Sequence, residues 1–124
     1  IFILIFGLII YIILNLNIDY IIYYFVKDRS DLIKSIVRIL SFSFLFNIIY
    51  ETIVNQYLIV NNLFKDINKL KLIILSSSIL LGLPLIFFKG IYGAALTNFS
   101  YELIGLICAI NIFIRTKNTK TLFY

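Results

Sequence analysis

The sequence predicts an all-α integral membrane protein. Of its 124 residues, 62% are hydrophobic and 14% are charged, whereas soluble domains average about 45–50% apolar and about 25% charged residues. The apolar residues are gathered in runs that show no sustained alternation with polar residues. Such runs suit membrane helices, which need about 17–25 mainly apolar residues, better than membrane strands, which alternate over about 9–11 residues.

Polar breaks divide the chain into about four predicted transmembrane helices. Their approximate limits are 1–26 with a break near 15–19, 32–60, 70–88 and 91–114, followed by a polar tail over 115–124. The first helix is broken by Asn15, Asn17 and Asp19, so a short half-helix is expected after the break. A charged stretch precedes the second helix, which Ser30 or Asp31 could cap, because side-chain oxygens at a helix start accept hydrogen bonds from free backbone N–H groups.

The third and fourth helices are predicted to form a tight pair. A polar segment over 61–69 separates the second helix from the third, and Lys89-Gly90 makes a very short turn into the fourth. Pro84 lies late in the third helix, where its missing N–H is expected to kink or unwind the last turn. Six basic residues flank the spans on one side of the membrane and five on the other. This near-equal distribution gives only a weak indication of which side is cytoplasmic, and we assign the side of the 61–71 loop to the cytoplasm.

Composition also bears on chemistry and partners. The chain contains no His and a single cysteine, Cys108, in an apolar run. It lacks the usual zinc ligand and the usual general base at neutral pH, so no metal site or cofactor is expected, and catalytic-triad or metallohydrolase chemistry is disfavoured. We attribute the net charge of +5 to Lys and Arg residues that flank the membrane spans. A nucleic acid is therefore not expected as a partner. Because the chain starts at Ile1 inside an apolar run and contains no Met, we expect it to be a fragment of a longer protein.

Five polar residues inside the apolar spans form the candidate pathway for a substrate or ion. They are Asn47, Glu51, Asn55, Asn98 and Glu102. The members of each helix are spaced by four, which places them on one helix face. An ionisable group in the hydrocarbon core costs about 2.5–3.5 kcal/mol on insertion scales, which favours a bundle interior or an aqueous cavity. The glutamates are therefore predicted to bind a proton, a cation or a substrate group.

A purely structural role is the alternative for these residues. The asparagines can form hydrogen bonds between helices, and each glutamate can pair with a Lys or Arg elsewhere in the bundle. Tyr20, Tyr23 and Tyr24, beside the first charged stretch, are typical of an aromatic belt at a membrane interface.

The stretch GIYGAALTNFSYE at 90–102 resembles the pattern G-x-x-G-A-A-x-x-T/N-x-x-x-E of a late transmembrane helix in bacterial polysaccharide flippases. These belong to the multidrug/oligosaccharidyl-lipid/polysaccharide exporter superfamily. The order of helices and of the short basic turn at 62–65 is similar as well. The usual Gly of the 20–27 region is absent, and Arg38 and Lys89 are the basic residues near span ends that could meet a diphosphate.

The resemblance implies a fold and a function. The chain would be the C-terminal part, helices nine to twelve, of a bundle with about twelve or more helices in two lobes related by pseudo-symmetry. It would flip undecaprenyl-diphosphate-linked oligosaccharide, the repeat unit of a surface polysaccharide, across the bacterial inner membrane by alternating access. A proton or sodium ion would be the coupling ion.

Three other functions stay open at the level of sequence, of which a purely structural membrane subunit would leave Glu51 and Glu102 unexplained. A drug/cation antiporter of the same superfamily would carry the same polar residues. A membrane polysaccharide polymerase or glycosyltransferase is disfavoured, because such enzymes are expected to carry catalytic residues on a sizeable loop outside the membrane, and the loops here are short.

Overall fold

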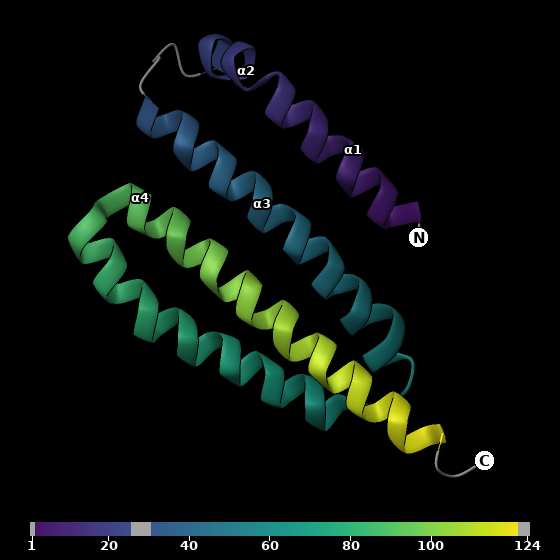
Figure 1. Cartoon of the computed structure of the whole chain (residues 1–124). Coiled ribbons are helices and arrows are strands. Elements are labelled where there is room, and N and C mark those ends of the chain that lie inside the picture. Colours follow the sequence, from purple (N-terminus) through teal and green to yellow (C-terminus); the bar gives the residue numbers. More distant parts are fainter. Residues whose placement is uncertain (1, 26–30, 122–124) are drawn as a thin grey trace.

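The computed structural model describes residues 2–25 and 31–121, and these form helices joined by short turns. The elements are α1 (Phe2–Leu16), α2 (Ile18–Phe25), α3 (Asp31–Ile53), the π-helix η1 (Val54–Ile59) and α4 (Phe64–Thr121) (Figure 1). Within the described ranges, Asn17 and residues 60–63 are the non-helical positions, and there is no strand. The prediction of an all-α protein is therefore confirmed for this part of the chain. The proposed cap Ser30 lies outside the described residues, and α3 begins at Asp31.

Two helical segments are long and apolar enough to cross a membrane. They are Asp31–Ile59, with 29 residues, and Phe64–Lys117, with 54 residues. Ile5–Leu16 and Ile18–Tyr24 meet the same criteria as a pair bent by 69°, which makes three candidate spans if the pair counts as one. By length and composition, the described part of the chain is compatible with a membrane protein.

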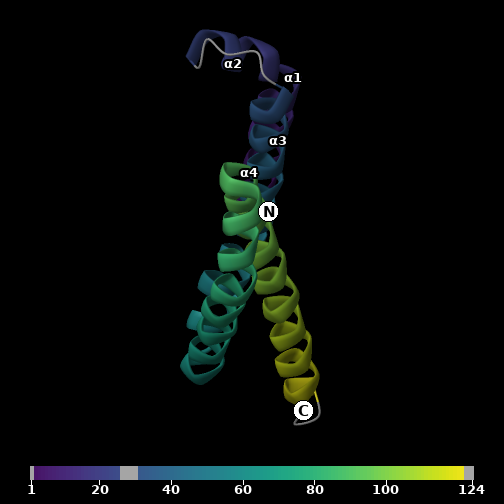
Figure 2. The ribbon, with the colours of Figure 1, turned by 90° about the vertical axis from the view of Figure 1, so that its left-hand side faces the viewer.

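The first break in the helical path falls at Asn17. The side-chain amides of Asn17 and Asn15 donate hydrogen bonds to the carbonyl oxygens of Ile13 and Tyr11. Such bonds to the preceding turn compete with the regular helix pattern and often accompany a bend. Beyond the break, α2 turns away from α1 and lies across the end of the bundle (Figures 1 and 2).

The turn between η1 and α4 is a helix-ending motif built around Asn62. Asn62 has a φ of 56°, a left-handed conformation that asparagine tolerates better than most residues. Its N–H donates to the carbonyl of Ile59, and the N–H of Leu63 donates to the carbonyl of Leu58, both at 2.9 Å. This pair of bonds is the Schellman pattern, which satisfies the last carbonyls of a helix. The next helix begins at Phe64, ahead of the apolar span predicted from 70.

The long helix α4 reverses direction at Gly90. As one straight helix, its 58 residues would extend about 87 Å, far beyond the roughly 30 Å of a hydrocarbon core. Gly90 has φ 56° and ψ −131°, a conformation that glycine adopts readily and other residues avoid. The two arms, 64–89 and 91–121, therefore form a helical hairpin (Figure 1). The backbone angles stay helical through Pro84, so the helix does not unwind there as expected.

Small residues bring the two arms of this hairpin together near the turn. A Cβ at Gly93 would overlap the carbonyl group of Leu85, and one at Gly82 would lie 2.8 Å from Thr97 Cγ2. Farther from the turn the arms diverge (Figure 2). Side chains of α3 and η1 pack between them, so the core is made by three helical segments. Its buried members are Tyr50, Val54, Leu58, Ile67, Leu70, Leu106 and Ala109.

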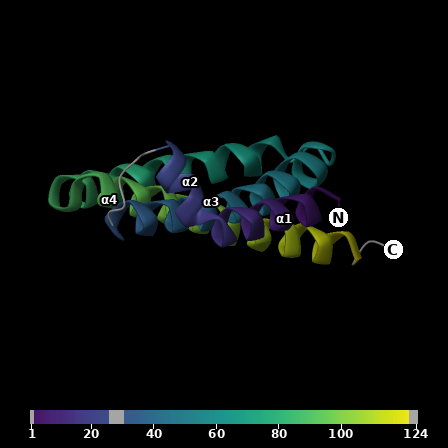
Figure 3. The same cartoon turned by 90° about the horizontal axis from the view of Figure 1, so that it is seen from above.

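Helix α1 covers the other side of α3. The rings of Tyr11 and Phe42 meet edge to face with centroids 5.1 Å apart, and Gly7 lies directly against Ile48. Seen from above, the long helices run along a common direction (Figure 3). Their outer surfaces carry many exposed Ile, Leu and Phe side chains, from Phe2 in α1 to Ile114 in α4. Such a surface is costly in water and suits a lipid environment.

Candidate functional site

The centre of the candidate site is a hydrogen bond between α3 and the second arm of α4. Nδ2 of Asn47 donates to Oε1 of Glu102 at 3.0 Å. Glu102 is only 8% exposed. Beside this contact, the rings of Phe46 and Phe99 pack with centroids 5.5 Å apart. The carboxylate is therefore held by an amide from a neighbouring helix within apolar surroundings, where an unpaired polar group would be costly.

A second polar contact lies on the same arm as Glu102. The hydroxyl of Tyr101 donates to Oδ1 of Asn98 at 2.6 Å, and both side chains are partly buried. Asn98 precedes Glu102 by about one turn, so the two side chains share a face of the arm. The amide of Asn98 is thereby oriented by its own helix, whereas Glu102 is tied to α3.

Two hollows adjoin the Asn47–Glu102 pair. The larger, of about 410 Å³, is lined by Asn47, Tyr50, Lys71, Ile74, Leu75, Ser78, Tyr101 and Glu102. The smaller, of about 230 Å³, is lined by Leu40, Ser43, Phe44, Asn47, Asn98 and Glu102. Asn47 and Glu102 line both. Three of the five predicted pathway residues, Asn47, Asn98 and Glu102, thus gather around one buried carboxylate.

The other two predicted pathway residues lie elsewhere. Nδ2 of Asn55 donates to Oε2 of Glu51 at 2.7 Å, and both side chains are exposed. Neither residue lines the two hollows beside Glu102. The five residues therefore form two separate polar clusters, an inner one around Glu102 and an outer one formed by Glu51 and Asn55.

The structure also brings residues to the site that the sequence argument did not select. Lys71 and Ser78 of the first arm line the larger hollow together with Glu102. Among the described residues, no ion pair joins Lys71 to Glu102. Their spacing in the sequence predicts a common helix face, because Lys71, Ile74 and Ser78 lie three and four residues apart. Lys71 is not among the predicted pathway residues because it is counted above with the basic residues that flank the spans.

The chemistry available at this junction is polar binding inside apolar helices. A carboxylate with one amide partner can accept a further hydrogen bond or a cation, and the neighbouring hollows offer room for a ligand. Among the described residues, no group of three or more His, Cys, Asp or Glu side chains could hold a metal ion.

The fold and the site together define an all-helical protein with membrane-length apolar helices and a buried polar junction. The chain matches no protein-family model, no curated protein and no solved structure.

Proposed function

We propose that this chain belongs to a membrane transporter that flips lipid-linked oligosaccharide across the bacterial inner membrane. The observation that carries the proposal is the Asn47–Glu102 contact, 3.0 Å long, between two apolar helices and beside two hollows. A carboxylate is expensive in a membrane and is generally kept there for an ion or substrate pathway. The resemblance of residues 90–102, which include Glu102, to the polysaccharide flippases supplies the substrate class.

In this proposal the chain crosses the membrane four times. The α1–α2 pair, α3 with η1, and the two arms of α4 each make one crossing, and together they form part of one lobe of a larger two-lobed bundle. The reversal at Gly90 supports counting α4 as two crossings, because each arm alone has the length that a bilayer requires.

Transport would proceed by alternating access without covalent chemistry. Glu102 binds the coupling ion, a proton or a sodium ion, and the Asn47 amide holds its carboxylate in place. An ion that binds more tightly in one of two states shifts the balance between them. Lys71 adds a positive charge to the larger hollow, where it could meet the diphosphate of an undecaprenyl-linked substrate. The outer Glu51–Asn55 pair would face the opposite lobe.

The decisive variant is Glu102→Gln in the full-length protein. Gln keeps the shape of the side chain and can still bond to Asn47, but it cannot carry the charge. We expect surface polysaccharide to be lost in a strain that lacks its own flippase, while the amount of protein in the membrane stays normal. Glu51→Gln, on the exposed face, is the matched control and should cause a smaller defect. Normal polysaccharide with Glu102→Gln would remove the coupling role.

A drug/cation antiporter is the second candidate. The larger hollow combines the carboxylate of Glu102 with the rings of Tyr50 and Tyr101, and aromatic faces beside a carboxylate attract organic cations. Resistance to cationic dyes without any effect on surface polysaccharide would favour this function.

A further inference from the structure

Helix α2 has only 8 residues but presents one buried face and one exposed face. Ile18 and Ile22 are buried, at 3% and 1% exposure, whereas Tyr20 is 77% exposed. Tyr23 and Tyr24 are exposed as well. The helix lies across the end of the bundle and is bent by 69° from α1 (Figure 2). At 1.5 Å per residue it extends about 12 Å, much less than the roughly 30 Å of a hydrocarbon core.

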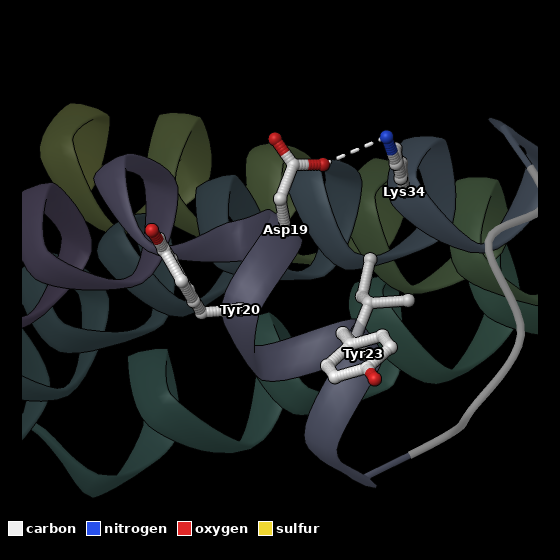
Figure 4. A pocket seen from close by; sticks show the side chains of 5 residues that line it. Asp19, Tyr20, Tyr23 and Lys34 are labelled. Atoms are coloured by element: carbon white, nitrogen blue, oxygen red, sulfur yellow. Dashed lines mark ion pairs between the residues drawn. The ribbon is translucent and has the colours of Figure 1, made fainter.

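An ion pair fixes α2 to α3. Nζ of Lys34 lies 2.7 Å from Oδ1 of Asp19, and the two side chains are 30% and 71% exposed (Figure 4). A pair of charges with this exposure is strongly disfavoured in hydrocarbon, which provides no hydrogen bonds to the open side of the carboxylate. The end of the bundle that carries α2 therefore belongs at the boundary between lipid and water.

A hollow of about 460 Å³ lies beside this ion pair. It is lined by Asp19, Tyr20, Ile22, Tyr23 and Lys34. Figure 4 shows the rings of Tyr20 and Tyr23 on α2 and the ammonium of Lys34 reaching over from α3. The lining combines a cation, an anion and aromatic rings. A phospholipid headgroup has the matching chemistry, with a phosphate for Lys34, an amine for Asp19 and a glycerol region that tyrosine rings commonly border.

We propose that α2 is an interfacial helix that lies in the headgroup layer and seats a phospholipid headgroup in this hollow. The crossing assigned above to the α1–α2 pair is then made by α1 alone, and α2 lies along the membrane surface between α1 and α3. This inference rests on the proposed membrane location, but it does not depend on what the protein transports.

Tryptophan fluorescence tests the depth of α2, because these 124 residues contain no Trp and any Trp in the rest of the full-length protein can be replaced by Phe. Tyr20→Trp reports on α2, and Ile9→Trp, on an exposed position of α1, reports on a membrane crossing. The full-length variants are placed in phosphatidylcholine nanodiscs that contain a lipid with a nitroxide on its headgroup or deep in its acyl chain. We expect Tyr20→Trp to be quenched most by the headgroup label and Ile9→Trp most by the deep label.

The other quenching results overturn the proposal in distinguishable ways. Strongest quenching of Tyr20→Trp by the deep label would show that α2 is inserted as the second half of a broken span. Absence of lipid quenching at Tyr20→Trp, with Ile9→Trp quenched by the deep label, would show that α2 is covered by protein or surrounded by water. Absence of quenching at both sites would refute the membrane location itself.

A photoreactive phospholipid tests the hollow. Phosphatidylethanolamine with a diazirine on an acyl-chain carbon close to the glycerol, which leaves the headgroup amine free for Asp19, should form adducts with α2 in the wild-type chain. Lys34→Gln, which removes one positive charge, should lower the adduct yield about fivefold, because each basic residue near a membrane surface contributes about 1 kcal/mol of attraction to anionic groups. Lys65→Gln, at an exposed position of α4 outside the hollow, is the matched control and should leave the yield unchanged. Equal yields in all three chains would refute headgroup binding.

Discussion

The hairpin of α4 depends on the absence of a side chain at Gly93. A Cβ added there would lie 2.5 Å from the carbonyl carbon of Leu85 and 3.0 Å from the backbone nitrogen of Ile86. Carbon atoms in contact prefer about 3.5–4.0 Å, so Gly93→Ala must push the arms apart by about 1 Å. The obstacle is backbone, which cannot rotate out of the way as a side chain can.

The expected cost follows from two opposing terms. Adding atoms to a well-packed contact costs about 1–3 kcal/mol. Because the obstacle at Gly93 is backbone, the cost of Gly93→Ala should lie near the upper end of this range. Replacing glycine by alanine inside a helix stabilises the helix by about 1 kcal/mol, because alanine has the higher helix propensity. We therefore expect the free energy of unfolding to fall by about 2 kcal/mol.

Unfolding by sodium dodecyl sulfate in lipid bicelles measures this difference. Gly82→Ala is the matched control, because its added Cβ would meet the end of the Thr97 side chain at 2.8 Å and the strain should be nearly offset by helix propensity. If the arms do not touch at Gly93, propensity alone acts, and Gly93→Ala would be more stable than the wild-type chain. A stabilising Gly93→Ala would thus refute the hairpin packing.

Two further substitutions test the turn and the core. Gly90→Ala meets no atom within 4 Å, so its cost comes from the backbone conformation alone, and we expect a loss of about 1–3 kcal/mol in the free energy of unfolding. An unchanged stability would mean that the turn does not have its observed backbone angles. Leu70→Ala removes a side chain that is 0% exposed and should cost about 2–5 kcal/mol. Leu80→Ala, on the same arm but 74% exposed, should cost much less, and equal losses would contradict the assignment of the core.

Much of the architecture can be read from the distribution of polar residues. Long apolar runs predict helices, because a helix satisfies its backbone hydrogen bonds internally in lipid. The helical path breaks at Asn17 and reverses at Gly90, within segments that the polar residues and the Lys89-Gly90 pair indicated. The expected unwinding at Pro84 does not occur, because the backbone angles stay helical through this residue.

The two polar clusters could not be separated from sequence alone. Residues spaced by four drift by about 40° per step around a helix, so a stripe that is inward at Asn47 can be outward at Asn55. The change to the π-helix η1 at Val54 further changes the direction in which successive side chains point around the helix axis. Nothing in the composition predicts this π-helix. Which end of the stripe faces α4 is decided by packing against the second arm.

The central claim is that α3 and the second arm of α4 are joined by the Asn47–Glu102 contact. A double-mutant cycle with Asn47→Ala, Glu102→Ala and the combined variant isolates this pair. We predict a coupling free energy between about 0.6 kcal/mol, the average for hydrogen bonds between membrane helices, and about 1.7 kcal/mol, the largest value found for them. Additive losses, with no coupling between the two sites, would contradict the claim.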